Sequence, residues 1–416
     1  MSTESSDRRP EWPGTVYCGR SVRGLLPLLE GLPRLSDHPN RALQTRDALV
    51  AHLLAFFDPT LRSLRLIEDF SATRQARRYL AIPRLPKSTL ADFHRLADPG
   101  VLAPIVAHLL GELGRRGQAT PAGLPESLGR VLAVDGTFLA LAADVAWAVH
   151  RQTKDGRHRR SARLDVHLDV AAGLPRVVAV HGSEASEPAA AAGSIQPGAV
   201  HVYDRGFFDF ALIGRHLAIS AEVPTPFVMR MRAPGPRTPK FARGAEKPPG
   251  AQDAAAGVLS DHTGHLAGSR RRAAPAAMLR EVVIASPGEP GGTIHLLTDL
   301  LEVPARVVGT LYRYRWQVEL FFRWLKATAH FRHLLSQRRE AIAFEVHVAV
   351  IGALLLALRY DARPSRYAYA LLHQVSCGAA SAEEVLPIMA ERERRSALER
   401  EGQRRRRERA AGAREA

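Results

Sequence analysis

The sequence predicts a mixed α/β protein in which a central sheet is flanked by helices. Short runs rich in Val, Ile and Leu alternate with helix-like segments between residues 131 and 231. Two of these runs, Val131–Asp135 and Ala199–Asp204, end in an aspartate. Helical patterns precede and follow this region. We therefore expect a helical domain at residues 41–125 and a charged helical tail at residues 361–416.

The composition is that of a globular chain with an excess of positive charge. Of its 416 residues, 46% are hydrophobic, and 58 Lys and Arg against 42 Asp and Glu give a net charge of +16. This excess favours polyanions, with nucleic acid first among them, although the Arg-rich composition also suits a GC-rich genome. Cys18 and Cys377 form no metal-ligand spacing, which fits a reducing cytoplasm. The apolar run Val346–Leu358 is too short to span a membrane, and no early segment resembles a signal peptide.

Residues 1–40 are rich in Pro, Gly and charge and predict a loosely ordered arm. The domain that follows shows helical spacing, with a capped helix at Pro86–Leu96 that begins at Ser88. Earlier helices are expected at Asp47–Phe57, Leu61–Glu68 and Ala72–Leu80. Such a basic helical bundle either binds DNA or packs on the next domain, and the sequence leaves both readings open.

The first half of the α/β region predicts three strands. Val131–Thr137 reads as a short buried strand that delivers Asp135 and turns at Gly136. The strands Leu164–Val170 and Pro175–Val180 form a hairpin. Before the hairpin lies a basic stretch, His150–Arg163, which is either a solvated loop or a clamp for phosphates. Its candidate DNA contacts are Arg157, Arg159 and Arg160.

The second half repeats the pattern of a strand that ends in an acid. Asp204 closes Ala199–Asp204, and the chain then turns at Gly206. Helices are expected at Glu184–Ala192 and Phe208–Leu217, and a last strand at Phe227–Met231. The order β, β, β, α, β, α, β is typical of a ribonuclease H-like, mixed five-stranded sheet. In that fold the first and fourth strands are neighbours, so Asp135 and Asp204 would lie side by side and require a cation to offset their repulsion.

The chain between this sheet and the next helix is longer than the fold requires. We expect residues 232–294 to form an inserted, β-rich subdomain, so that the ribonuclease H-like domain comprises residues 126–231 and 295–360. Possible strands in or at the end of the insertion are Gly257–Leu259, Leu279–Ala285 and Thr293–Thr298. A disordered basic linker is the alternative.

The stretch Leu311–Lys326 lacks Gly and Pro and predicts one continuous helix. At about 100° per residue, its polar residues fall within about 60° of one another, on one stripe. These residues are Tyr312, Arg315, Glu319 and Lys326. The opposite face, with Trp316, Leu320 and Trp324, would pack against a sheet. The stripe is either a site for a metal ion and phosphates or a solvated face with an ion pair.

The spacing Tyr-x2-Arg-x3-Glu-x6-Lys, together with Asp135 and Asp204-Arg205-Gly206 upstream, resembles the signature of DDE transposases of the insertion-sequence-four family. The resemblance covers residues 131–358. It implies that Asp135, Asp204 and Glu319 are catalytic and hold two Mg²⁺ ions, with Mn²⁺ as a substitute. It also implies that Tyr312, Arg315, Lys326 and Arg205 bind DNA.

By this resemblance we expect an enzyme that cleaves double-stranded DNA at the ends of a mobile element and joins them to a target, as a homodimer in the end-paired complex. A bacterial cytoplasmic location near the nucleoid and the absence of a membrane segment follow. The alternatives are a non-catalytic DNA-binding remnant or inhibitor of transposition, and a nuclease of the same fold that joins no strands.

Three features stay outside this match. The insertion has no tryptophan to hold a flipped base, so base flipping is left open, as is a substitute such as Phe227 or Phe241. The tail from Glu391 is expected to be a solvated, frayed helix, with a DNA-binding or subunit-contact role as the alternative. Three histidines at positions 167, 181 and 201 have unrelated spacings and read as core or loop residues rather than metal ligands.

Overall fold

A computed structural model describes residues 43–360, without 58–60, 75, 77–83, 97, 117–119, 143, 153–157, 184–185, 232–240, 268–273, 290 and 328–333, and parts of 371–402. The N-terminal arm, both cysteines and most of the charged tail lie outside these residues. The chain divides into two compact units, one formed by Met1–Ala91 with Leu355–Ala416 and the other by Asp92–Leu354. The candidate site lies within the second unit.

The first unit contains the helices α3 (Thr45–Phe57) and α4 (Leu64–Ala72), which agree with the helical pattern. Helix α6 (Lys87–Leu96) begins one residue before the expected cap, so Ser88 lies inside the helix instead of capping it. The first N–H group of α6, that of Lys87, donates instead to the carboxylate of Glu68 on α4, at 3.2 Å. A helix start without a side-chain cap of its own is thus satisfied by a neighbouring helix.

The remaining helices belong to the second unit, except that the last one, α13, ends in residues assigned to the first unit. Their bounds are α7 (Ala103–Arg115), α8 (Glu187–Gly193), α9 (Phe210–Ser220), α10 (Ala251–Ala255), α11 (Ala305–Tyr314), α12 (Trp316–Ala327) and α13 (Arg339–Tyr360), with short 3₁₀ turns η1 (Pro99–Leu102), η2 (Glu126–Leu128) and η3 (Arg205–Phe207). Helix α13 is long and apolar enough to cross a membrane, yet 94% of its apolar window is buried inside the structure. That burial is typical of a core helix.

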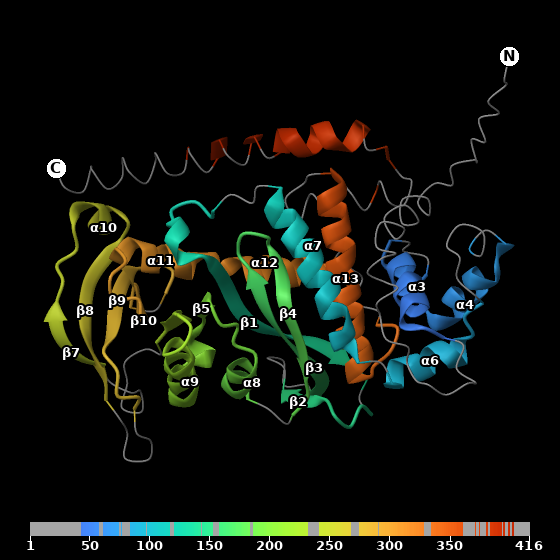
Figure 1. Ribbon diagram of the computed structural model, residues 1–416, viewed down its shortest axis with the longest axis horizontal. Coiled ribbons are helices and arrows are strands. Elements are labelled where there is room, and N and C mark those ends of the chain that lie inside the picture. Colours follow the sequence, from blue (N-terminus) through green and yellow to red (C-terminus); the bar gives the residue numbers. More distant parts are fainter. Residues whose placement is uncertain are drawn as a thin grey trace. The chain divides into compact units, whose positions relative to one another are not determined.

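The strands of the described residues join in one ten-stranded sheet, in the order β2-β3-β1-β5-β6-β10-β9-β8-β7, with β4 also paired to β3 (Figure 1). Their bounds are β1 (Arg130–Leu141), β2 (Val149–Gln152), β3 (His158–Asp169), β4 (Leu174–His181), β5 (Ala199–Tyr203), β6 (Phe227–Arg230), β7 (Phe241–Glu246), β8 (Val258–Leu266), β9 (Leu279–Ala285) and β10 (Thr293–Thr298). The mixed α/β class is as predicted, but the sheet has ten strands where five were expected.

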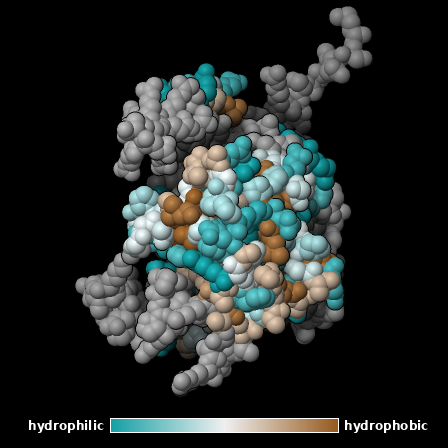
Figure 2. Space-filling model, turned by 90° about the vertical axis from the view of Figure 1, so that its left-hand side faces the viewer, coloured by the Kyte–Doolittle hydropathy of each residue, from teal (hydrophilic) through white to brown (hydrophobic). Residues whose placement is uncertain are grey.

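The extra width comes mainly from the inserted segment. Strand β10 pairs antiparallel with β6, and β9, β8 and β7 follow outward, so the described strands of the insertion continue the central sheet. The expected strands near residues 257, 279 and 293 are present, whereas β7 was not predicted. Five of its six residues are exposed, and its sequence, Phe-Ala-Arg-Gly-Ala-Glu, lacks a buried face. Figure 2 looks onto the end of the sheet where β7 lies and shows mixed hydrophilic and hydrophobic side chains.

Strand β1 lies inside the sheet and carries Asp135. It pairs antiparallel with β3 and parallel with β5, where Val134 lies opposite Tyr203. Val134 and Tyr203 belong to the core that includes α9 residues such as Leu212. Since side chains alternate along a strand, the residue after Val134 points to the other face, toward α11 and α12. These two helices run behind the strands in the view of Figure 1.

Gly136 does not make the turn that the sequence predicted, because β1 continues through it to Leu141. The glycine has a packing role: a Cβ placed there would lie 2.6 Å from Oδ1 of Asp165 on the paired strand β3. Any larger residue would therefore displace a buried carboxylate. Asp135 accordingly lies inside a long strand, one position past the parallel pairing with β5.

Candidate active site

Asp135 and Asp204 lie next to each other on neighbouring parallel strands. Each is one residue beyond the matched pair Val134 and Tyr203. The Asp135 carboxylate is held toward its own strand by the N–H of Gly136, at 2.8 Å. The predicted proximity of the two aspartates is thus produced by the register of β1 and β5.

The predicted single helix is two helices, α11 and α12, with Arg315 between them. The N–H of Arg315 donates to the carbonyl of Tyr312, and the N–H of Val318 donates to the carbonyl of Arg315, both at 3.1 Å. These three-residue bonds tighten the helix for one turn without reversing its direction. Tyr312, Arg315 and Glu319 therefore still reach the same side.

The apolar face of α12 differs from the prediction. Trp316 and Leu320 are 50% and 41% exposed, whereas Trp324 is buried as expected. The buried side is formed instead by Val318, Phe321, Phe322, Trp324 and Leu325. At about 100° per residue, Trp316 and Leu320 lie about 180° and about 140° from the buried Leu325, so these two residues belong to the exposed side of α12 itself.

Arg315 connects two of the three predicted catalytic acids. Its guanidinium donates to Oδ2 of Asp135 at 2.9 Å and to Oε1 of Glu319 at 2.8 Å. The Arg315 side chain is 12% exposed, so these ion pairs are largely shielded from water. The third acid is held by a different residue, since the Tyr312 hydroxyl donates to Oδ1 of Asp204 at 3.0 Å.

Lys326 reaches the same strand one step further along. Its ammonium donates to the hydroxyl of Thr137 at 2.6 Å. Thr137 is two residues after Asp135 on β1 and therefore faces the same side of the sheet. All four residues of the predicted stripe thus lie on the side of the sheet where β1 and β5 carry the two aspartates.

Burial and charge both act on the titration of this cluster. Burial is the largest cause that raises the pKa of Asp135, to about 6, and the carboxylates of Asp204 and Glu319 add to it, while Arg315 opposes it. For Arg315, burial lowers the pKa, but the acids Asp204, Glu319 and Asp135 outweigh it, so the pKa is raised. Repulsion between the neighbouring carboxylates therefore favours a nearby cation.

Residues 126–356 match the family described as "Transposase DDE domain". The chain belongs to the DDE transposases. A putative transposase, y4zB, of Sinorhizobium fredii is 27% identical over 290 residues, which cover 68% of this chain and 73% of that protein. A probable transposase for insertion sequence element IS5377 of Geobacillus stearothermophilus is 32% identical over 71 residues, 17% of this chain and 19% of that protein.

Among solved structures, a piggyBac transposase synaptic complex with hairpin DNA aligns over 89% of this chain and 81% of that chain. Its TM-score is 0.41 and its sequence identity 10%, a likeness too low to carry an argument.

Two further residues of the transposase touch this cluster and were missed in the sequence. Arg230, the last residue of β6, lies with a guanidinium nitrogen 3.7 Å from Oδ1 of Asp204. It also forms a two-pronged pair with Glu289, at 3.2 and 2.6 Å. The sequence contained an indication of Arg230, because this residue lies at the end of the strand predicted next to the one that carries Asp204. It contained no indication of Glu289, since the partner of that residue is 59 positions away.

The residues predicted to contact DNA lie in separate parts of the transposase. Arg205 follows Asp204 directly, in η3, and is exposed. Arg160 lies on β3 and donates to the carbonyl of Ala148 at 3.4 Å. Arg157 lies outside the described residues, and only the backbone of Arg159 is described, within β3. The described part of the basic stretch is a hairpin of β2 and β3, not a loop.

Arg163, at the end of that basic stretch, is buried and paired with an acid. It is 5% exposed and pairs with Asp165 at 3.1 Å. It therefore offsets the charge of a buried acid.

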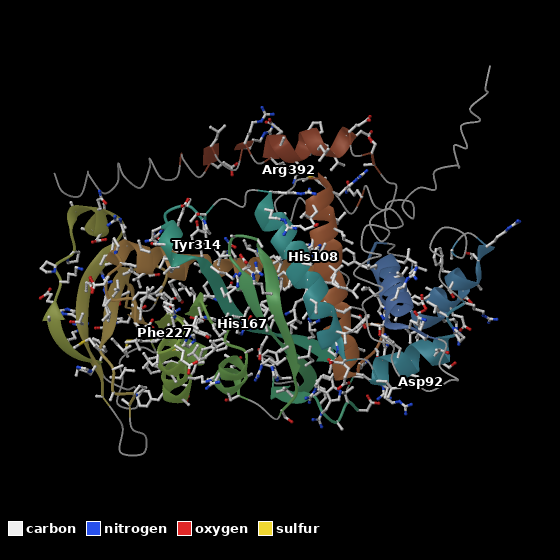
Figure 3. All side chains as sticks on the ribbon, viewed as in Figure 1. Asp92, His108, His167, Phe227, Tyr314 and Arg392 are labelled. Carbon is white, nitrogen blue, oxygen red and sulfur yellow. The ribbon has the colours of Figure 1, made fainter. Side chains whose placement is uncertain are left out.

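The predicted core histidines are partly confirmed. His167, which is labelled in Figure 3, and His201 are 1% and 0% exposed. Their ring centroids lie 5.6 Å apart in an edge-to-face contact. The side chain of His181 is 22% exposed and lies 3.5 Å from Asp165. Burial lowers the pKa of His167 to about 3, so its ring is neutral. Despite their unrelated spacings, two of the three histidines meet in the core.

Among the residues that the structure describes, no group of three or more His, Cys, Asp and Glu side chains is arranged to hold a metal ion. The contacts of Arg315 give the physical reason, because its guanidinium already bridges Asp135 and Glu319. The donor set itself fits a hard cation such as Mg²⁺, since all the candidate ligands are carboxylate oxygens. A metal ion and Arg315 would therefore compete for the same acids.

Proposed function

We propose that this transposase belongs to the insertion-sequence-four type, binds the terminal repeats of a mobile element, cleaves the DNA ends and joins them to target DNA. The observation that carries the proposal is the Arg315 bridge between Asp135 and Glu319, with Asp204 beside it. Three acids gathered where β1, β5 and α12 meet, and lined by Arg, Tyr and Lys, are what phosphoryl transfer requires. The strand order β4-β3-β1-β5-β6 supports the ribonuclease H-like assignment.

In this proposal the acids and the cations have separate roles. Asp135, Asp204 and Glu319 would hold two Mg²⁺ ions, with Mn²⁺ as a substitute. When bound, such ions activate water or a 3′ hydroxyl and stabilise the leaving oxygen. The protein must align the acids, which the register of β1 and β5 does for the two aspartates, and the bound cations would keep the carboxylates ionised.

The basic side chains of the site would exchange their present partners for DNA phosphates when DNA binds. Arg315 has its two donors 2.9 and 2.8 Å from carboxylates, in the fork geometry that also suits a phosphate. Metal binding would neutralise Asp135 and Glu319 and free Arg315 to bind the phosphate beside the cut. Lys326 and the Tyr312 hydroxyl, now on Thr137 and Asp204, would bind neighbouring phosphate oxygens.

The wider assembly rests on charge and on the family. The net charge of +16 favours double-stranded DNA as partner, and we propose that the helices within residues 41–125 contribute to recognition of the ends. We also propose a homodimer in the end-paired complex, in a bacterial cytoplasm near the nucleoid. Two alternatives share the charge and the sheet: a non-catalytic DNA-binding protein that inhibits transposition, and a nuclease that joins no strands.

The test is an assay of the full chain with Mg²⁺ and with DNA that contains both flanks of its own gene. Nicks at fixed positions followed by joined products support the proposal. Nicks without joined products favour the nuclease, and binding without nicks in Mg²⁺ or Mn²⁺ favours the inhibitor. The Asp135→Asn variant is the control for contaminating nucleases.

A further inference from the structure

Arg230 and Glu289 form a bidentate ion pair beside the candidate active site. One guanidinium nitrogen of Arg230 lies 3.2 Å from Oε1 of Glu289 and the other lies 2.6 Å from Oε2. A guanidinium binds a phosphate through the same two parallel hydrogen bonds. The Glu289 carboxylate therefore occupies a place that is shaped for an anion with two oxygens.

The surroundings of this carboxylate belong to the site. The Arg230 nitrogen that binds Oε1 of Glu289 is also 3.7 Å from Oδ1 of Asp204 and 3.5 Å from the Tyr312 hydroxyl. The pair with Arg230 is the main cause that lowers the pKa of Glu289, and the charge of Arg205 lowers it further, while Asp204 opposes both. An anion at this position thus has two arginines near it and lies next to a predicted catalytic acid.

The two partners are held very differently. Arg230 ends β6, which is paired on both sides, with β5 and with β10, and its side chain is 14% exposed. Glu289 lies on the short turn Ser286–Gly292 between β9 and β10, closed by a bond from the N–H of Ser286 to the carbonyl of Gly292 at 2.7 Å. Gly292 has a φ of 69° in this turn. The arginine is fixed by the sheet, whereas the acid is on a surface turn.

We propose that Arg230 forms a binding site for a phosphate of the DNA backbone, and that Glu289 occupies this site until DNA binds. The inference rests on the proposed function, because it names a contact of the same active site. The phosphate would replace the carboxylate on Arg230, and the turn that carries Glu289 would move its side chain into water. Glu289 then acts as an internal competitor that weakens the binding of any DNA that cannot displace it.

A purely structural role for the pair makes the opposite prediction. If Arg230 and Glu289 only fasten the β9–β10 turn to the sheet, loss of the Glu289 charge lowers the melting temperature and leaves DNA affinity unchanged. If Glu289 competes with DNA, loss of its charge tightens binding. DNA affinity therefore separates the two roles, and it can be measured without any cleavage.

The experiment compares Glu289→Gln with Glu246→Gln in the full chain. Both changes remove one negative charge, but Glu246 is an exposed residue at the end of the edge strand β7, separated from β6 by β8, β9 and β10. Binding of a fluorescent duplex oligonucleotide is followed by anisotropy in EDTA. We expect Glu289→Gln to tighten binding of the duplex by about threefold or more, the scale of one ion pair. The affinity of this variant should also exceed that of Glu246→Gln by about threefold or more.

A double mutant completes the test. In an Arg230→Gln background, the gain from Glu289→Gln should disappear, because the site that Glu289 occupies is gone. Equal affinities of the Glu289→Gln and Glu246→Gln variants, or a gain that persists without Arg230, would overturn the inference. Glu289→Ala is measured beside Glu289→Gln, since the amide oxygen of Gln can still accept from Arg230. If the wild-type chain binds no duplex, the proposed function fails at the first step.

Discussion

The guanidinium of Arg315 donates to the carboxylate of Asp135 at 2.9 Å, across 180 positions of sequence. This contact joins the turn between α11 and α12 to strand β1. Arg315 places a positive charge between Asp135 and Glu319, which offsets part of their repulsion. In the proposed mechanism, the same arginine would become available for a phosphate once a divalent ion takes over that role.

The first prediction concerns the three acids. Asp135→Asn, Asp204→Asn and Glu319→Gln should each abolish cleavage and leave DNA affinity equal or higher, since a negative charge near phosphate is removed. Addition of Mg²⁺ should raise the melting temperature of the wild type but not of these variants, because binding to the native state stabilises it. Near-wild-type cleavage by one variant would remove that residue from the site.

The sequence could predict this site because its parts lie in regular elements. Asp135 and Asp204 each end a buried apolar run, and the register of parallel strands then places them together. The stripe of Tyr312, Arg315 and Glu319 followed from helix geometry, and it survived the break at Arg315 because the tightened turn kept the direction of the chain.

The rest depended on pairings that no local pattern encodes. Arg230 meets Tyr312 across 82 positions and Glu289 across 59, on contacts set by the widened sheet. The edge strand β7 has no alternation of apolar and polar residues to indicate it. Gly136 was misread because a glycine after a strand usually marks a turn, whereas here it leaves room for Asp165.

The second prediction concerns pH. Burial is the main cause that raises the pKa of Asp135, Asp165 and Asp299 to about 6, from an ordinary value of 3.8. Each acid is therefore harder to ionise in the folded chain than in the unfolded chain. Folding thus takes up protons between pH 3.8 and about pH 6. These groups make the metal-free protein more stable as pH falls through that window, on the order of 1 kcal/mol for each.

The measurement is thermal melting in EDTA at about pH 7 and about pH 5. Asp135→Asn should melt higher than the wild type at the upper pH and lose much of this advantage at the lower one. A variant that melts lower at both pH values would show that the ion pair with Arg315 outweighs the cost of burying the carboxylate.

The third prediction concerns the anchor that positions α11. Arg280 is 1% exposed, pairs with Asp261 at 2.6 Å, and donates to the carbonyl of Val303 just before the helix, also at 2.6 Å. Arg280→Met leaves a buried acid and carbonyls unpaired, so we expect a loss of about 3–5 kcal/mol of stability. The control is Arg243→Met, because the Arg243 side chain is 46% exposed and its buried partner Glu281 keeps a second contact, with His295 at 2.8 Å, so the loss should be smaller, about 1–2 kcal/mol.

Urea unfolding of both variants provides the comparison. The double variant Arg280→Met with Asp261→Leu should recover part of the loss, because it removes the buried acid together with its partner. Equal losses for Arg280→Met and Arg243→Met would contradict the anchor.

The fourth prediction concerns the basic stretch. Replacement of Arg157, Arg159 and Arg160 with Ala should flatten the dependence of duplex affinity on salt, because fewer counterions are released. Affinity is measured over a series of salt concentrations, with Arg163→Ala left out since that residue pairs with Asp165 in the core. A slope equal to that of the wild type would show that these three arginines face solvent and not DNA.

The last prediction concerns Arg315 itself. Arg315→Lys keeps the charge but cannot donate to Asp135 and Glu319 in the fixed fork of a guanidinium. We expect it to fold, to bind duplex DNA through the remaining basic residues, and to lose cleavage or joining by about tenfold or more, the scale of a misplaced reacting group. Tyr312→Phe removes only the hydroxyl on Asp204 and should lose less. Melting, duplex affinity and single-turnover cleavage are measured on the same preparations. If Arg315→Lys melts early yet cleaves at the wild-type rate once folded, Arg315 only balances charge, and the phosphate-binding role passes to Lys326 and Arg230.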